Sequence, residues 1–173
     1  ARWRKLDHIV HEVQRPPSGV GCRRLGIRYA PAMTGLKTVV VGDHLTLEGL
    51  EAVALGEAKV SLGRRGRDAL ERAHEVVRAG LADGGKAIYG INTGFGALAE
   101  VPIDGQDLRT LQRNLIVSHA VGVGASLSQE VVRGMMLLRA NVLSLGYSGA
   151  RPLVVETLIE MINAGVHPRI PSK

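Results

Sequence analysis

The sequence predicts a mainly α-helical fold, and three observations support this prediction. Apolar residues recur at three- and four-residue spacing through most of residues 36–173. Residue types that start helices precede these stretches, and glycines follow them. Only one β-branched run, TVVV at residues 38–41, has the composition of a strand, and its length suits an edge strand. We therefore expect at most a short β element near residues 38–41.

The first two helices are expected between this run and a glycine-rich segment. Thr46 is a suitable N-cap for a helix over residues 46–57, because its hydroxyl can accept a backbone N–H of the first turn. The apolar stripe of this helix would consist of Leu47, Leu50 and Ala54. A second helix is predicted over residues 67–81, ended by Gly84 and Gly85, with an apolar face of Leu70, Ala73, Val77 and Leu81.

Three further helices are expected in the second half of the chain. Asp107 can cap a helix that ends near Gly122 and carries on one side Leu108, Leu111, Leu115 and Ile116. The next helix is predicted over residues 129–145, with an apolar stripe of Val131, Met135, Leu138, Val142 and Leu145. The last helix would begin at Pro152, a residue favoured in the first turn, and end at Gly165.

The formal net charge of +6 is unevenly distributed along the chain. Residues 1–35 hold seven Arg and Lys residues against Asp7 and Glu12, whereas the rest holds fifteen basic against fourteen acidic residues. A nucleic-acid-binding domain would carry its basic residues on a folded face, so we expect no nucleic acid partner. Residues 1–35 are predicted to be a basic leader, an extension upstream of Met33 or a disordered segment, and residues 36–173 the folded segment.

Cysteine usage and hydropathy predict a cytoplasmic protein. The single Cys22 cannot form an internal disulfide, and no apolar run has the length of a membrane span or the pattern of a secretory signal. We therefore expect no membrane partner. A metal site is not predicted either, because no His or Cys pair has the spacing of zinc ligands, and His8 with His11 lies in the leader.

The segment AIYGINTGFGALA, residues 87–99, concentrates glycines and aromatic rings. Its second half, GFGALA, matches the loose G-x-G-x-x-G/A pattern of dinucleotide-binding loops. However, the pattern also requires a preceding strand, a following helix and an acidic residue about twenty positions on, and the neighbouring sequence supplies none of these. Phosphate binding is therefore disfavoured. The glycines would instead let the backbone approach another chain or a ligand closely.

Tyr89 and His119 are the candidates for chemistry, and each has a structural alternative. Tyr89 can act as a base only if its surroundings favour the phenolate, because a free phenol stays protonated at neutral pH. Alternatively, it is a packed ring whose hydroxyl bonds to the backbone. His119 is expected to share the inward face of Leu111 and Leu115, which equally fits a hydrogen-bonded core histidine. Ser118 should face another way, so no pair of nucleophile and base is predicted.

Four ordered blocks carry a resemblance to a known family: YGINTGFGALA, LQRNLIVSHAVGVG, MLLRANVLSLGYSGARP and INAGVHPRIPSK. Together they resemble the N-terminal part of histidine ammonia-lyase and of its aromatic amino acid ammonia-lyase and aminomutase relatives. The resemblance extends over about residues 38–173. It implies the all-helical ammonia-lyase and fumarase-like fold, and a homotetramer whose long central helices form a bundle, with active sites shared between subunits.

This resemblance implies roles for three residues. The tyrosine that begins the first block is the family's catalytic base, which implies that Tyr89 removes a β-proton from the substrate. Gly96 lies where family members bring backbone close to the bound substrate. His119 falls on a Ser-His pair associated with holding the imidazole of histidine, which implies conversion of L-histidine to urocanate and ammonia. Some aromatic aminomutases share this pair, so a tyrosine or phenylalanine ammonia-lyase or an aromatic 2,3-aminomutase stays open.

The family's electrophile is 4-methylidene-imidazole-5-one (MIO), formed from an internal Ala-Ser-Gly that these 173 residues do not contain. Related chains continue past the position of Lys173 into the glycine-rich loop that holds this triad. Without the electrophile the substrate has no good leaving group, so the segment is expected to be inactive alone. Its implied partner is the remainder of the ammonia-lyase chain. A non-catalytic helical interaction module is the alternative from another class.

Overall fold

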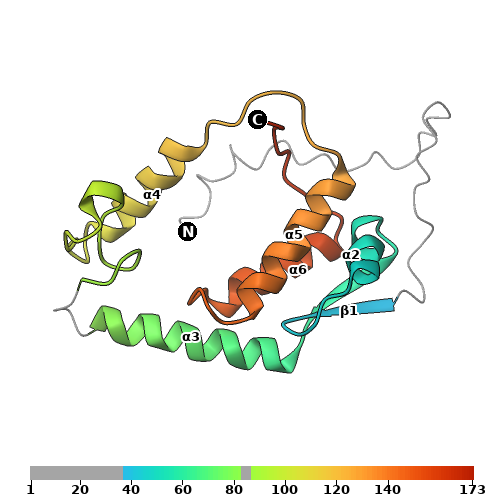
Figure 1. Ribbon diagram of the computed structural model, residues 1–173, viewed down its shortest axis with the longest axis horizontal. Coiled ribbons are helices and arrows are strands. Elements are labelled where there is room, and N and C mark those ends of the chain that lie inside the picture. Colours follow the sequence, from blue (N-terminus) through green and yellow to red (C-terminus); the bar gives the residue numbers. More distant parts are fainter. Residues whose placement is uncertain (1–36, 83–86) are drawn as a thin grey trace, which may run out of the picture.

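The computed structural model describes residues 37–82 and 87–173. The predicted leader, residues 1–35, and the predicted helix stop at Gly84 and Gly85 lie outside the described residues. The elements follow in the order β1 (Lys37–Val41), α2 (Leu47–Ala54), β2 (Ala58–Leu62), α3 (Arg64–Ala82), the short 3-10 helix η1 (Gly96–Leu98), α4 (Leu108–His119), α5 (Gln129–Ser144) and α6 (Pro152–Asn163). The predicted mainly α-helical class is confirmed (Figure 1).

The β structure is a two-stranded parallel sheet of β1 and β2, in which Val39 lies opposite Val60. Helix α2 connects the two strands, as a parallel pair requires a crossover. The prediction included only residues 38–41, and β2 is an addition to it. The alternation in β2, with Ala58 and Val60 buried and Lys59 exposed, extends over only five residues, too few to stand out between two helices.

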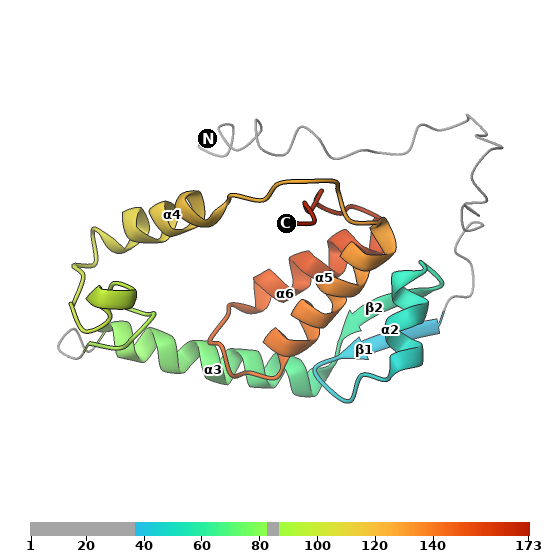
Figure 2. The same cartoon turned by 45° about the horizontal axis from the view of Figure 1, so that its top comes forward.

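The hydrophobic core lies where α2, α5 and α6 meet the sheet. Helices α5 and α6 lie side by side next to α2 and the strands in both views (Figures 1 and 2). The largest apolar side chains with at most 2% of their surface exposed are Leu70, Leu137, Ile162, Val41, Val53, Val132 and Val155. They come from five of the elements, so this core joins segments that are far apart in the sequence.

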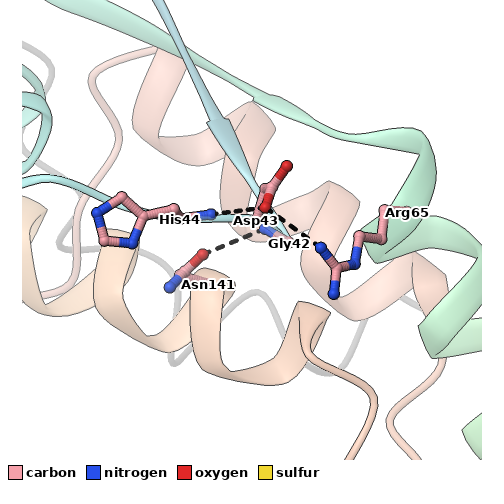
Figure 3. Close-up of polar contacts among 5 residues, drawn as sticks. All are labelled: Gly42, Asp43, His44, Arg65 and Asn141. Carbon is pink, nitrogen blue, oxygen red and sulfur yellow. Dashed lines mark hydrogen bonds and ion pairs between the residues drawn. The ribbon is translucent and has the colours of Figure 1, made fainter.

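Two asparagines fasten the helices to the strands. Asn141 of α5 accepts the backbone N–H of Gly42, at the end of β1, with a distance of 3.1 Å (Figure 3). Asn163 of α6 exchanges two hydrogen bonds of 2.8 Å with the backbone of Val60. Gly42 has a φ of +87°, and a Cβ there would come 2.5 Å from the Cα of Gly66. The chain can therefore turn out of β1 and pass close to α3 only with glycine at this position.

Arg133 joins the ends of two helices inside the core. Its Nε donates to the carbonyl of Val53 and its Nη1 to the carbonyl of Ile162, both at 2.9 Å. These carbonyls lie in the last turns of α2 and α6, at the negative ends of the helix dipoles, and each also accepts a backbone N–H, from Gly56 and from Gly165. Burial lowers the pKa of Arg133. The buried guanidinium is thus held by the carboxyl ends of two helices.

One apolar side of α5 faces away from this core. The stripe predicted over residues 129–145 is 43–54% exposed, and we refer to it as the outer face of α5; it consists of Val131, Met135, Leu138, Val142 and Leu145. The buried residues of α5 lie beside this stripe and include Val132, Met136, Leu137 and Ala140. The predicted stripe thus lies on one helix side but outside the core, because α5 is apolar on two sides. Leu47, named in the predicted stripe of α2, is 80% exposed.

The helices of the described ranges are too short or too polar to cross a lipid bilayer. Within these same ranges, no three His, Cys, Asp or Glu side chains gather as the ligands of a metal ion would.

Candidate active site

The glycine-rich segment forms a loop at the end of α3 that is remote from the sheet (Figures 1 and 2). We call residues 87–99 the glycine loop. An isolated antiparallel bridge joins Thr93 to Pro102, and Gly94 donates its N–H to the carbonyl of Val101 at 3.2 Å. The chain therefore folds back on itself before it enters α4.

Two polar side chains inside the glycine loop hold its shape. Asn92 accepts the N–H of Ile88 through Oδ1 at 2.7 Å. The hydroxyl of Thr93, a residue only 1% exposed, accepts the N–H of Gly90 at 3.3 Å and donates to the carbonyl of Gly94 at 3.0 Å. Asn and Thr commonly stabilise turns through such bonds to nearby backbone. Neither residue was predicted to have a role, although their place between two glycines is a signal for a turn.

Tyr89 lies on the surface of the glycine loop. Its residue surface is 66% exposed, and its ring meets Phe95 edge to face with centroids 6.0 Å apart. Within residues 37–82 and 87–173 its hydroxyl takes part in no hydrogen bond. The alternative of a packed ring with a backbone-bonded hydroxyl is therefore not seen among the described residues. The phenol is instead open to a ligand or to further protein.

Gly96 begins the 3-10 helix η1 with a φ of +58°, a backbone conformation that favours glycine. No atom lies within 4 Å of the position that a Cβ would occupy there. The left-handed backbone explains why glycine stands at this position. Its predicted closeness to a substrate stays a prediction.

His119 is the last residue of α4 and is exposed. The expectation that it faces inward with Leu111 and Leu115 is wrong, because α4 buries none of its residues and those two leucines are only half-buried. The expectation for Ser118 is wrong too. Its Oγ lies 3.0 Å from Nδ1 of His119, since both side chains fold back toward the carbonyl of Leu115 in the last turn.

The segment that follows His119 pairs with the C-terminal residues of the sequence. Val123 and Lys173 exchange two backbone hydrogen bonds of 2.6 and 3.0 Å. The N–H of Ser172 donates to the carbonyl of Ala125 at 2.9 Å, and the N–H of Leu127 donates to the carbonyl of Ile170 at 2.8 Å. Residues 123–127 and 170–173 therefore run antiparallel, and the blocks containing SHAVGVG and HPRIPSK, which are separate in the sequence, lie side by side.

Two hollows of the described chain lie away from the three candidate residues. One, of about 470 Å³, lies beside β1 and α2 and includes Asp43 and His44; the other, of about 190 Å³, lies at the start of α5 and includes His167. Neither is lined by Tyr89, Gly96 or His119. All three candidates are exposed.

The second hollow has perturbed electrostatics. Burial, together with the positive charge of Arg133, lowers the pKa of His167, and the carboxylate of Glu130 partly opposes this shift. The pKa of Glu130 is lowered by hydrogen bonds from its own backbone and from Ser128, and to a smaller extent by His167. These groups lie around the N-terminal turn of α5, apart from the glycine loop.

Comparison with known proteins gives consistent matches over the described ranges. The family model for aromatic amino acid lyases matches residues 45–173. The chain is 50% identical to a histidine ammonia-lyase of Anaeromyxobacter dehalogenans over 132 residues, which are 76% of this chain and 26% of the relative.

Solved structures show the same partial likeness. The histidine ammonia-lyase of Trypanosoma cruzi superposes with a TM-score of 0.71 at 36% identity, covering 79% of this chain and 26% of that structure. The tyrosine aminomutase of Streptomyces globisporus gives a TM-score of 0.70 at 32% identity with the same coverage. The chain thus spans about a quarter of the length of the relatives it matches. With three quarters of its residues matched to one family model and the same fold in solved members, the chain belongs to the aromatic amino acid lyase family.

Proposed function

We propose that this chain provides the N-terminal part of an ammonia-lyase that converts L-histidine to urocanate and ammonia. The observation that carries the proposal is the presentation of Tyr89, which is exposed, has a hydroxyl without a partner in the described chain, and lies on a loop fixed by Asn92 and Thr93. Identity of 50% to a histidine ammonia-lyase supports histidine as the substrate.

In this proposal Tyr89 takes a β-proton from the substrate. A phenol serves as a base only when neighbouring positive charge or hydrogen bonds favour the phenolate. Such neighbours would come from protein beyond the described residues, which agrees with the open surface around the ring. His119 would hold the substrate side chain, and the open space beside Gly96 would admit the substrate close to the backbone.

Members of this family use MIO, which supplies an electrophile for the α-amino group when it is present. The residues of this chain do not fit that group. Ala-Ser-Gly does not occur in the sequence, and its two nearest matches have other structural roles. The run from Ala125 to Leu127 pairs with residues 170–172, and the carbonyl of Gly149 accepts a hydrogen bond from Nδ1 of His74 at 3.2 Å. The electrophile would therefore come from a segment outside these 173 residues.

The remainder of the lyase chain is the proposed partner, and a homotetramer the proposed assembly. The outer face of α5 supports this partnership, because five apolar side chains at helical spacing are left uncovered. An exposed apolar stripe of this kind is typical of a surface that packs against further protein. By itself the chain is expected to be inactive.

The test is a chimaera in which residues 38–173 replace the matched segment of the Anaeromyxobacter dehalogenans enzyme. We expect urocanate to form from L-histidine, measured by its ultraviolet absorbance. Tyr89→Phe should then lower turnover by about 10²- to 10⁴-fold without altering the circular dichroism spectrum, because the ring is kept and only the proton acceptor is lost. Near-normal turnover by this variant would remove Tyr89 from the mechanism.

A tyrosine or phenylalanine ammonia-lyase or an aromatic 2,3-aminomutase is the second candidate, favoured by the structural likeness to tyrosine aminomutase. Supplying the chimaera with L-tyrosine and L-phenylalanine separates the two candidates. In the preferred case His119→Leu impairs turnover of histidine more than that of phenylalanine. Equal losses on both substrates would assign His119 a structural role only. Denaturing intact-mass analysis of the native assembly adds an independent check, because a companion chain lighter than its sequence by two waters would carry MIO.

A further inference from the structure

The turn between α5 and α6, residues 146–150, packs against the middle of α3. A Cβ at Gly146 would lie 2.7 Å from the carbonyl oxygen of Ala69. A Cβ at Gly149 would lie 2.2 Å from Cγ2 of Val77, two turns further along α3. Both distances are far below those of normal contacts, so the turn can touch α3 in this way only with glycine at these two positions.

Polar contacts fasten α3 to the same part of the molecule. Nδ1 of His74 lies 3.2 Å from the carbonyl oxygen of Gly149, and the ring nitrogen donates because a carbonyl can only accept. Near the start of α3, Nη1 of Arg67 pairs with Oε1 of Glu156 on α6 at 2.6 Å. Leu70 of α3 has no exposed surface. The first part of α3 is therefore held against the core by apolar, polar and ionic contacts.

The other end of α3 carries the glycine loop (Figures 1 and 2). A Cβ at Gly80 would come 2.8 Å from Cδ1 of Ile88, so the start of the loop rests directly on the last turn of α3. Oδ1 of Asn92 accepts the N–H of Ile88 at 2.7 Å, and Tyr89 is the next residue. A continuous set of contacts thus leads from the turn between α5 and α6, through α3, to Tyr89.

We infer that Gly149 and His74 are positioning residues, which fix the direction of α3 and thereby the place of Tyr89. The place matters because a base must reach the proton that it removes, and a misplacement of about 1 Å can cost about 100-fold in rate. The effect on turnover rests on the proposed function, whereas the placement of the glycine loop by the turn between α5 and α6 does not.

Gly165 separates backbone strain from displacement of α3. Gly149 has a φ of +64° and Gly165 a φ of +69°, so alanine at either position imposes a similar left-handed strain. No atom lies within 4 Å of a Cβ at Gly165. A Cβ at Gly149 would in addition push Val77 by about 1.5 Å before a normal contact distance is reached. Gly165→Ala is therefore the matched control for Gly149→Ala.

The placement of the glycine loop can be measured in the 173-residue chain by pulsed electron paramagnetic resonance. Spin labels are attached through Ala97→Cys in the loop and Arg139→Cys on α5, both exposed positions, after Cys22→Ser has removed the native thiol. Gly149→Ala should broaden the distribution of distances between the labels or shift its mean by about 1.5 Å. Gly165→Ala should leave the distribution as it is. An unchanged distribution in Gly149→Ala would overturn the inference.

A double variant tests the steric origin of this shift. Val77→Ala removes the Cγ2 that a Cβ at Gly149 would meet. The nearest remaining atoms would be the carbonyl oxygen of Ala73 at 3.4 Å and Cβ of Val77 at 3.5 Å, which are ordinary contacts. Gly149→Ala combined with Val77→Ala should therefore regain the native distances, although the backbone strain is kept. A double variant that stays displaced would contradict the steric link between the turn and α3.

The effect on chemistry is measured in the chimaera with L-histidine and with L-histidine deuterated at Cβ. Gly149→Ala should lower kcat by about 10- to 100-fold with little change in KM, because a displaced base slows proton removal more than binding. Its β-deuterium isotope effect should rise, whereas a mere loss of folded enzyme leaves the isotope effect unchanged. Gly165→Ala should keep the native isotope effect, and the double variant with Val77→Ala should restore it.

His74 provides a test that introduces no clash. His74→Leu removes the donor to the carbonyl of Gly149 and should lower kcat by about 2- to 10-fold, as expected for loss of one hydrogen bond, again with a raised isotope effect. His74→Asn keeps an N–H donor on the side chain and should restore both values. Equal losses in the two variants would show that this hydrogen bond does not position the loop.

The two proposals fail in distinguishable ways. A chimaera without activity on histidine, tyrosine or phenylalanine would contradict the proposed function, and the distances between the spin labels would still decide whether the turn places the glycine loop. An active chimaera in which Gly149→Ala keeps the native kcat and isotope effect would overturn the positioning role and leave the lyase assignment intact.

Discussion

The sheet with α2, α5 and α6 encloses side chains such as Leu137 and Val155 that have no exposed surface, whereas α4 buries none of its residues. The glycine loop likewise keeps Tyr89 exposed and is held by hydrogen bonds from Asn92 and Thr93. In both views α4 and the glycine loop lie apart from the α5 and α6 pair (Figures 1 and 2). The difference teaches that this chain packs its own core around one end and offers its candidate chemistry at another.

The largest contrast is expected from leucines in the two regions. Leu137→Ala leaves a cavity in the core and should lower the free energy of unfolding by about 2–5 kcal/mol. Leu115→Ala on α4, where the side chain is only half-buried, should cost less than about 1 kcal/mol. Urea denaturation of the 173-residue chain measures both. Equal losses at the two positions would mean that α4 has a packed core of its own.

The next effect concerns the arginine that bridges two helix ends. Arg133→Ala removes the two side-chain hydrogen bonds to the carbonyls of Val53 and Ile162 and should cost about 1–3 kcal/mol. Arg139→Ala, on the exposed side of the same helix, is the matched control and should change the unfolding midpoint little. A similar loss for both variants would show that the buried bridge does not contribute to the stability of the core.

Helix caps sharpen the comparison further. Thr46 accepts the N–H of Gly49 at 3.1 Å, so Thr46→Ala should cost about 1 kcal/mol and speed hydrogen exchange in the first turn of α2. Asp107 holds the same position on α4 without a side-chain cap bond, so Asp107→Ala should cost less than half as much. A larger effect at Asp107 would reveal an interaction that exists only in solution.

The smallest effect is the pH dependence contributed by His167. Its pKa is lowered in the folded chain, so the unfolded chain takes up the proton first as the pH falls. The free energy of unfolding should therefore decline from about pH 6.5 down to the pKa of the folded state and then level off as far as this residue is concerned. His167→Asn should flatten this part of the profile. A steeper decline in the variant would mean that folding raises the pKa of His167 instead of lowering it.

The sequence predicted the helices better than their contacts. The helix over residues 129–145 has nearly the predicted bounds, yet its predicted stripe lies outside the core. Periodicity identifies an apolar side of a helix, but α5 has two apolar sides. Leu137 lies on the buried side and Leu138 on the exposed side, although they are the same residue type. Tertiary packing decides which apolar side of a helix is buried. In a family member that spans a quarter of the length of its relatives, the second apolar side can be needed for contact with further protein.

The residues of the candidate site were named from the resemblance and stay a prediction, and their geometry could not be predicted from the sequence. Resemblance singled out Tyr89, Gly96 and His119, and the positive φ of Gly96 agrees with the conformational freedom expected of a glycine in this loop. Helical spacing placed Ser118 and His119 on different sides, which is correct for Cβ directions in mid-helix. At a helix end, flexible side chains can both turn back to the same carbonyl, here that of Leu115, and spacing carries no information about this.

The pairing of residues 123–127 with residues 170–173 has a consequence for the order in which the protein takes shape during synthesis. Every element of the core has left the ribosome once Asn163 has emerged, whereas the partners of Val123 and Leu127 are the last residues of this sequence. Because domains fold as the chain is made, the core can form before residues 123–127 have paired with residues 170–173. The late arrival of a few residues would therefore set the moment at which His119 takes up its position relative to the core.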